Sequence, residues 1–156
     1  MAGATSPKDI KIGVHVIDFV TNPPAGKNAV GVIFDSKVKE SVDDAQIIFD
    51  ALKAFLPHSA TAAKPVLVDI RDLDDAQGLR AVVVADHMKP FYDKLSAFGH
   101  RTNALILSTD LDCVRAEKCT VGIASAPRVE IVVSSKQAQA SGITFSEAFR
   151  MMVTEY

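Results

Sequence analysis

Four short apolar runs, rich in β-branched residues, constrain the fold of this chain more than any other feature of its sequence. They are AVGVIFD at 29–35, PVLVDIR at 65–71, AVVVAD at 81–86 and ALILSTD at 104–110. A strand with one solvent-exposed face alternates apolar and polar residues. Continuous apolar runs therefore indicate strands buried on both faces, as in a parallel sheet.

Helical patterns separate these runs. Residues 41–56 place their apolar side chains on one helical face, with Ser41 as the predicted N-cap. Residues 87–99 repeat the scheme and stop at Gly99, whereas 72–80 leave room only for a short helix or turn. Strands that alternate with helices predict an α/β fold, a single-domain Rossmann-like or flavodoxin-like open sheet that is mostly parallel and covers residues 1–156.

The last third of the chain changes character. TVGIAS and RVEIVVS flank APR with alternating residues, which predicts an antiparallel hairpin at a sheet edge. A short helix, KQAQAS, ends at Gly142. A closing helix is predicted over 144–156, with Thr144 and Glu147 in a capping-box pattern and an apolar stripe of Phe145, Ala148, Phe149, Met152 and Val153.

The first element allows two interpretations. Ser6 and Pro7 are typical of a helix start, and Ile10, Val14 and Ile17 have helical spacing. Yet apolar residues also alternate here and β-branched residues dominate, which is typical of a strand. Residues 7–20 are therefore helix or strand from the sequence alone, and the helix is favoured because TNPPAGKN then serves as the loop into the first strand.

Composition and charge exclude several functional classes. The 156 residues suffice for one core that buries about two thirds of the surface of the unfolded chain. A formal net charge of -2 gives no reason to expect a nucleic acid or an anionic membrane as partner. Uninterrupted apolar segments stay far below the ~18 residues of a membrane helix. MAGATS resembles a start codon joined to a mature sequence from which a signal peptide has been removed.

Motifs for catalysis and cofactor binding do not match. The turn after the first predicted strand, FDSKVKES, lacks the glycines of a dinucleotide fold, and PAGKN lacks the remainder of a P-loop. G-x-S-x-G is absent, and the histidines are scattered away from the cysteines, so no zinc-ligand spacing arises. We therefore expect no catalytic residue, no metal and no cofactor.

Polar residues gather where the predicted strands end. They are Asp35 and Ser36, Asp86 and His87, then Ser108, Thr109 and Asp110. Ligands of open α/β sheets bind at the carboxyl ends of the strands, so the hypothesis for this set is a ligand-binding edge. The competing interpretation is that these side chains cap the helices that follow.

Both cysteines lie in DCVRAEKC, at Cys113 and Cys119. The spacing suits neither a zinc site nor a thioredoxin-type pair. A disulfide would close a loop of about seven residues and contribute about 2.4 kcal/mol. Two free thiols in a cytosolic protein are the alternative, but charged neighbours favour a bridge in a solvent-exposed loop.

The order of elements resembles the YfiR/HmsC-like periplasmic domain family. The matching segments are DFVTNPP before the first strand, the cysteine loop, VEIVVS in the hairpin and ASGITFSEAFRMM at the end. The family has the motif F-V-x-W-P where this chain has DFVTNPP. It has the motif R-x-x-G-L-x-I-S-S-x-L-L-x-L-A where this chain has ASGITFSEAFRMM. Asn22 replaces the aromatic, and the cysteines of the family's second disulfide are missing. Cys113 and Cys119 match the C-terminal bridge.

The resemblance implies a periplasmic, non-enzymatic signalling regulator. Characterised members restrain a membrane-bound diguanylate cyclase by protein contact, so we expect a membrane-bound signalling protein as partner, with a homodimer as an option. The alternative is a periplasmic small-molecule-binding domain resembling one lobe of a substrate-binding protein, with the strand-end residues as its pocket. A bilobal binder needs two lobes, so tight capture by this chain would require dimerisation.

Overall fold

A seven-stranded sheet forms the centre of the molecule in the order β2-β1-β3-β4-β5-β6-β7. The structure is a computed structural model and describes residues 5–60 and 63–155. Strands β1 to β5 run parallel, β6 pairs antiparallel with β5, and β7 runs parallel to β6. The strands are β1 (Ala29–Phe34), β2 (Lys64–Asp69), β3 (Leu79–Val84), β4 (Leu105–Ser108), β5 (Val121–Ala124), β6 (Glu130–Val133) and β7 (Thr154–Glu155). The predicted mostly parallel α/β sheet with a C-terminal hairpin is confirmed.

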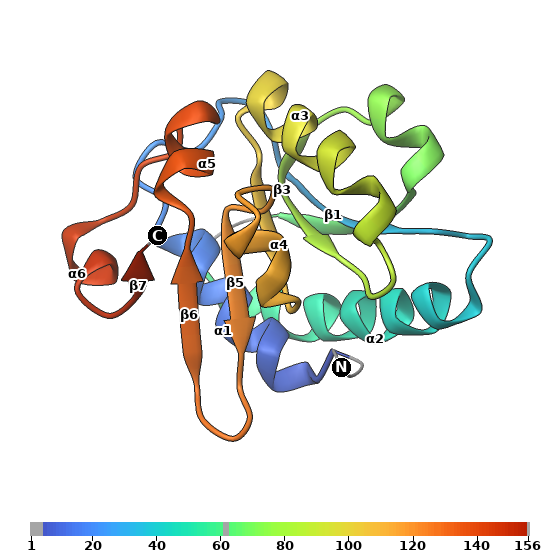
Figure 1. The fold of residues 1–156 in the computed structure, drawn as a ribbon, viewed down its shortest axis with the longest axis horizontal. Coiled ribbons are helices and arrows are strands. Elements are labelled where there is room, and N and C mark those ends of the chain that lie inside the picture. Colours follow the sequence, from blue (N-terminus) through green and yellow to red (C-terminus); the bar gives the residue numbers. More distant parts are fainter. Residues whose placement is uncertain (1–4, 61–62, 156) are drawn as a thin grey trace.

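Helices cover both faces of this sheet (Figure 1). One face carries α1 (Pro7–Asp18) and α2 (Lys39–Phe55), and the other carries α3 (Tyr92–Thr102) and α4 (Leu111–Arg115). The remaining helices are α5 (Ser135–Ala140), α6 (Glu147–Arg150) and the 3₁₀ turns η1 (Leu56–His58), η2 (Ile70–Asp75) and η3 (Lys89–Phe91). The loop between β5 and β6, which contains a cis Ala126–Pro127 peptide bond, projects from the lower edge of the molecule in Figure 1.

Two apolar cores lie on opposite faces of the sheet. Val83 of β3 belongs to the core beneath α1 and α2, and its neighbour Val82 belongs to the core beneath α3. Successive side chains of a strand point to opposite faces. The continuous apolar runs of β1, β3 and β4 therefore bury both faces, as their sequences predict.

Strand β2 does not follow that prediction. It is the outermost strand, with Val66 40% and Leu67 44% exposed. The Lys64 N–H donates to the Asn28 carbonyl at 2.9 Å, so the strand pairs on that side with β1. Its apolarity resembles that of an interior strand, and sequence alone does not reveal which strand lies at an edge.

The first element is a helix. Ser6 is its N-cap, and the Ser6 hydroxyl and the Asp9 carboxylate form a reciprocal capping box. Ile10, Val14 and Ile17 are buried, and they have the helical spacing rather than the alternating one. The capping box outweighs the β propensity of this segment.

Two predicted helix boundaries are wrong. α2 begins at Lys39 with Val38 as N-cap, and Ser41 lies inside the helix, where its hydroxyl accepts the Asp35 N–H. α3 begins after η3 and runs past Gly99 to Thr102, with Asn103 in the left-handed conformation as C-cap. Gly99 serves packing, because a Cβ there would lie 2.8 Å from Cδ1 of Ile106.

The closing helix is shorter than the sequence predicts. α6 has four residues and is capped by Ser146, so the capping box of Thr144 and Glu147 is wrong. Phe149 is fully buried, but Met152 is 63% exposed and does not belong to an apolar stripe. Residues 154–155 form β7 instead, because they pair with β6 and extend the sheet.

Candidate functional site

The strand-end residues lie along the carboxyl edge of the parallel sheet in three separate groups. Strand order places β1 between β2 and β3, so the chain leaves β1 towards one neighbour and returns on its other side at β3. Such a switch point leaves a crevice where α/β sheets bind ligands. Asp35 follows β1 and Asp86 follows β3, on the two sides of this point.

The first group is centred on Asp35. Its Oδ1 accepts the Lys37 N–H at 3.0 Å and the Arg71 Nη1 at 2.9 Å. The Lys37 N–H and the Arg71 guanidinium together hold the pKa of Asp35 below its ordinary value. Burial opposes ionisation of Asp69, but hydrogen bonds from Ser36 and Arg71 lower its pKa overall. Arg71 therefore joins the ends of β1 and β2.

The second group is the turn of Asp86 and His87. The Asp86 Oδ1 accepts the His87 N–H at 2.9 Å, and its Oδ2 lies 3.5 Å from His87 Nδ1. His87 adopts a φ of 64° and its side chain is exposed. Left-handed backbone at a residue other than glycine is uncommon, and His tolerates it better than most. The imidazole is thus held at the surface of the edge.

The third group follows β4. The Ser108 hydroxyl accepts the Asp110 N–H, and Asp110 caps α4 by accepting the Asp112 N–H, both at 2.9 Å. The Tyr92 hydroxyl donates to the other oxygen of Asp110. Burial, then this hydrogen bond, raises the pKa of Tyr92 well above its ordinary value. Asp35, Asp86, Ser108 and Asp110 each accept a nearby backbone N–H, but of these four side chains only that of Asp110 caps the helix that follows.

A network that the sequence interpretation missed fills the space between these groups. Asp44 of α2 is buried and accepts the Thr5 N–H at 2.6 Å, the Thr5 hydroxyl at 2.9 Å and the Asp86 N–H at 2.8 Å. The Thr5 hydroxyl also lies 3.1 Å from that of Thr109. In Figure 1 the beginning of α1 accordingly lies beside α2. The signal for Asp44 was a charged residue on the helix face of Ala45 and Ile48.

The carboxyl edge is consequently closed in this structure. The cavity beneath it, lined by Asp9, Ser108, Thr109 and apolar side chains, has a volume of about 10 Å³. That is roughly the space of one water molecule. A larger cleft of about 230 Å³ lies elsewhere, between α5, α6 and β7. A ligand at the carboxyl edge must therefore bind on its surface or displace what fills it.

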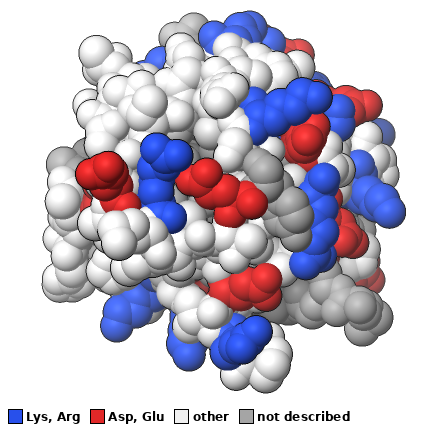
Figure 2. Space-filling view, turned by 60° about the vertical axis from the view of Figure 1, so that its left-hand side comes forward, with Lys and Arg blue, Asp and Glu red and all other residues white. Residues whose placement is uncertain are grey.

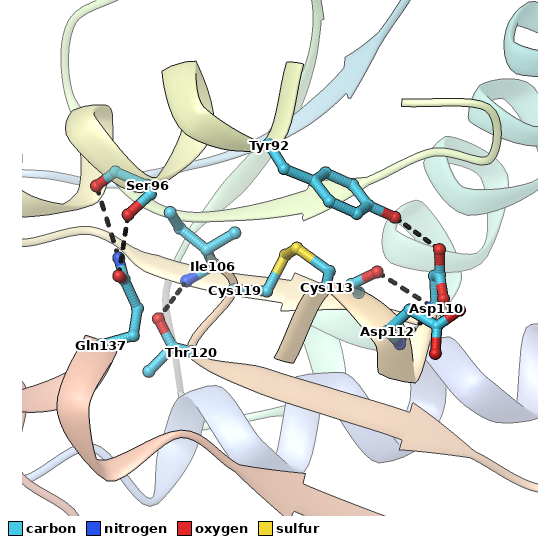
Figure 3. The surroundings of a disulfide bond; sticks show 10 residues. Tyr92, Ser96, Ile106, Asp110, Asp112, Cys113, Cys119, Thr120 and Gln137 are labelled. Atoms are coloured by element: carbon cyan, nitrogen blue, oxygen red, sulfur yellow. Dashed lines mark hydrogen bonds between the residues drawn. A yellow bond between two sulfur atoms is a disulfide. The ribbon is translucent and has the colours of Figure 1, made fainter. Parts of the chain in front are cut away.

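The disulfide forms between Cys113 of α4 and Cys119, with an S–S distance of 1.98 Å. The predicted bridge is confirmed, and the charged residues of the loop are exposed, but both cysteines themselves are fully buried in the core beneath α3. Figure 3 shows the sulfur atoms below α3, with Tyr92 and Ser96 above them and Ile106 and Thr120 beside them. The charged residues between the cysteines form only the outer layer of the loop.

Charged side chains on one face of the molecule and the potential metal ligands of the described residues were compared next with the edge. Figure 2 shows one face on which Lys or Arg and Asp or Glu side chains are interspersed rather than separated by sign. Among residues 5–60 and 63–155, no group of three His, Cys, Asp or Glu side chains is placed to hold a metal ion. Within the same residues, no helix has the length and apolarity required to cross a membrane.

Solved structures share this fold. A conserved domain protein from Vibrio cholerae aligns with a TM-score of 0.69 at 12% identity, over 94% of this chain and 59% of its own. An ABC domain from Streptococcus pneumoniae in complex with L-Trp gives 0.67 at 12%, over 94% and 60%. CD0873 from Clostridium difficile, a substrate binding protein with adhesive properties in a ligand-free, open structure, gives 0.68 at 10%, over 97% and 60%.

These likenesses establish the fold. The chain spans about three fifths of the length of each of these proteins. No family model matches the chain, and a search of curated protein sequences finds no match.

Proposed function

We propose that this chain is a non-enzymatic recognition domain that binds a small ligand at its carboxyl edge, in the manner of one lobe of a substrate-binding protein. The observation that carries the proposal is the switch point between β1 and β3, with Asp35 at the end of β1 and the contact between Asp44 and the Asp86 N–H at the end of β3. The likeness to a substrate binding protein and to a domain in complex with L-Trp supports it.

The contacts of the edge residues indicate what each contributes to binding. Asp35 and Asp110 are engaged by Arg71 and Tyr92, so they shape the edge rather than reach outward. Ser36 and His87 are exposed at the ends of β1 and β3, and they are the groups that a ligand can reach, although the Ser36 hydroxyl also donates to Asp69. A ligand bound on the surface of this edge is held tightly only when a second surface covers it, from another lobe, a partner or a second copy.

A location outside the cytoplasm fits this proposal. The Cys113–Cys119 disulfide persists in an oxidising compartment and would be reduced in most cytosols. We therefore place the domain in the periplasm or an equivalent extracytoplasmic space.

Thermal unfolding with a ligand panel tests the proposal. The panel contains amino acids, sugars, dicarboxylates and diamines, each at millimolar concentration. A ligand at 100 times its Kd stabilises the folded state by about 2.7 kcal/mol. The double variant Ser36→Ala, His87→Asn should remove this stabilisation while leaving the unliganded midpoint almost unchanged, since asparagine tolerates the φ of 64°. Ligand stabilisation that persists in the double variant, or no response to any member of the panel, would contradict the proposal.

The second candidate is a regulator that acts by protein contact, as the YfiR/HmsC-like resemblance implies. It is favoured by the disulfide at the position that the resemblance assigns and by the closed carboxyl edge. Its partner would be a membrane-bound signalling protein such as a diguanylate cyclase, and a homodimer is compatible with it. Lower cellular cyclic di-GMP when the chain is coexpressed with the cyclase separates this candidate from simple ligand binding.

A further inference from the structure

The cleft between α5, α6 and β7 lies at the other end of the strands from the carboxyl edge. Val133, the last residue of β6, lines this cleft and pairs with Val121, the first residue of β5. The cleft is therefore at the amino ends of the parallel strands. Figure 1 shows α5, α6 and β7 together on one side of the sheet. The lining contains none of the strand-end residues of the carboxyl edge, so the cleft is a separate candidate site.

The buried part of the lining is apolar. Val133 is 3% exposed, and Ala138 and Ile143 are each 7% exposed. Phe145 also lines the cleft, and its ring centroid lies 4.8 Å from that of the buried Phe149. These side chains are packed against the core and still leave a volume of about 230 Å³. A small ligand therefore finds an open apolar surface and displaces no side chain to reach it.

The polar part of the lining is half-buried or exposed. It consists of Ser135, Gln139, Thr144, Arg150 and Glu155. An apolar surface with a few placed polar groups is the usual composition of a small-molecule site. The volume of about 230 Å³ is below the roughly 300 to 1,000 Å³ of pockets for drug-sized ligands, so the ligand of this cleft is small.

Arg150 is the cationic residue of this lining. Its Nε donates to Glu155 Oε1 at 3.1 Å, and the Ser135 hydroxyl donates to Glu155 Oε2 at 3.4 Å. The two terminal amino groups of Arg150 have no hydrogen-bond partner among residues 5–60 and 63–155. Glu155 thus engages the guanidinium through Nε alone and leaves its planar end for a ligand.

The charges of the cleft favour a carboxylate over an amine. The planar end of a guanidinium matches the two oxygens of a carboxylate, with two parallel hydrogen bonds. Glu155 is the acidic residue of the lining, and each of its oxygens already accepts a hydrogen bond. An ammonium group would have to compete with Arg150 and Ser135 for these oxygens, whereas a carboxylate meets donors that are not engaged.

We propose that this cleft binds a small monocarboxylate with an apolar body. The carboxylate pairs with the terminal amino groups of Arg150, and the apolar body lies against Val133, Ile143 and Phe145. Both parts of the ligand are required, because an exposed ion pair contributes little by itself and the buried apolar area adds the remaining affinity. This site is additional to the one proposed at the carboxyl edge and does not depend on it.

Titration calorimetry of the full chain tests this inference, with phenylacetate as the probe. Phenylacetamide and 2-phenylethylamine are its neutral and cationic counterparts, and acetate lacks the apolar body. Phenylacetate should bind saturably at one site per chain. The other three compounds should bind at least about tenfold more weakly, because each loses either the charge-assisted hydrogen bonds or the apolar contact.

Substitution of Arg150 locates the carboxylate. Arg150→Gln should weaken phenylacetate binding at least about tenfold. Arg150→Lys should restore part of the affinity, since lysine keeps the charge but lacks the planar pair of donors. Both variants should remain folded, because the side chain is 59% exposed. Arg101→Gln is the matched control: Arg101 is 54% exposed, lies on α3 and pairs with Asp74, and its loss should leave binding unchanged.

Proton–nitrogen correlation spectra locate the ligand without any substitution. Phenylacetate should shift the amide signals of Ile143 and Thr144. Shifts confined to Ser36 and His87 would place the ligand at the carboxyl edge, which would overturn this inference and support the proposed function. Absence of phenylacetate binding, equal binding of phenylacetamide, or equal affinity of the parent and Arg150→Gln would each overturn this inference and leave the carboxyl edge to its own test.

Discussion

The cysteine loop and the carboxyl edge lie at neighbouring turns of the same sheet but are held by different forces. A covalent bond fixes Cys113 to Cys119 beneath a layer of charged residues. The edge is fixed by hydrogen bonds that converge on buried or half-buried carboxylates, with Asp44 and Asp35 at its centre. The bridged cysteines do not titrate, whereas the edge is held by hydrogen bonds to carboxylates, which do.

The two regions therefore lose their rigidity under different conditions. The bridge lowers the conformational entropy of the unfolded chain, and this contribution to stability does not depend on ionisation. The hydrogen bonds to Asp35 depend on its ionisation and on the donors that face it. A region held in this way can exchange its donors for those of a ligand, and the cysteine loop cannot.

Removal of the bridge should have the largest effect on stability. We expect the double variant Cys113→Ala, Cys119→Ala to lose about 2 to 3 kcal/mol of unfolding free energy, of which about 2.4 kcal/mol is the entropy of a loop of about seven residues. Urea unfolding in oxidising buffer measures the loss. The parent chain in reductant is the control and should approach the variant. Equal midpoints for parent and variant in oxidising buffer would show that the loop needs no covalent link.

Thr5→Val should have an intermediate effect. The variant keeps the shape and the N–H but loses the hydroxyl that donates to Asp44, at a cost of about 1.5 to 2 kcal/mol because the acceptor is a buried charge. Urea unfolding again provides the measurement. Thr21→Val is the matched control, since the Thr21 hydroxyl bonds Thr144 at an exposed position, and its cost should stay within about 0.5 kcal/mol. Equal losses at the two positions would mean that Asp44 does not depend on its donors.

Arg71→Gln should have the smallest effect at neutral pH and a visible one in acid. The folded pKa of Asp35 lies below its ordinary value of 3.8, so its contribution to stability is present above that value and is lost as the pH falls through the folded pKa. Without the guanidinium the folded pKa of Asp35 rises, and the loss begins at higher pH. Circular dichroism during acid titration should show a higher midpoint. Arg101→Gln, which affects the exposed Asp74, should leave it unchanged.

The sequence was most informative where one physical requirement dominates. Continuous apolarity at β1, β3 and β4 predicted strands buried on both faces, and these strands are interior. The same pattern wrongly predicted that β2 is buried on both faces, because an apolar run does not show how many strands lie beside it. Ser41 and Gly99 are residue types common at helix ends, but both lie inside helices. The Ser41 hydroxyl accepts the Asp35 N–H, and the absence of a Cβ at Gly99 leaves room for Ile106.

The candidate site was predicted in part. Parallel topology brings strand ends to one edge, so the spacing alone located Asp35, Asp86 and Ser108. Two of them have partners that lie far away in sequence: Asp44 is 42 residues from Asp86, and Arg71 is 36 residues from Asp35. Contacts of that range depend on how helices pack on the sheet, which a local pattern does not encode. For the same reason the sequence predicted the cysteine bridge but not its burial.

The unpaired edge of β2 affects the tendency of this protein to aggregate. Peptide groups of a strand face its two sides alternately, and since the Lys64 N–H turns towards β1, the nitrogen of Pro65 faces outward. Proline has no N–H, so a strand that added to this edge would lack one backbone hydrogen bond at Pro65. The exposed Val66 and Leu67 would otherwise favour such an addition. One imino acid in this place discourages the outermost strand from nucleating aggregates through its uncovered side.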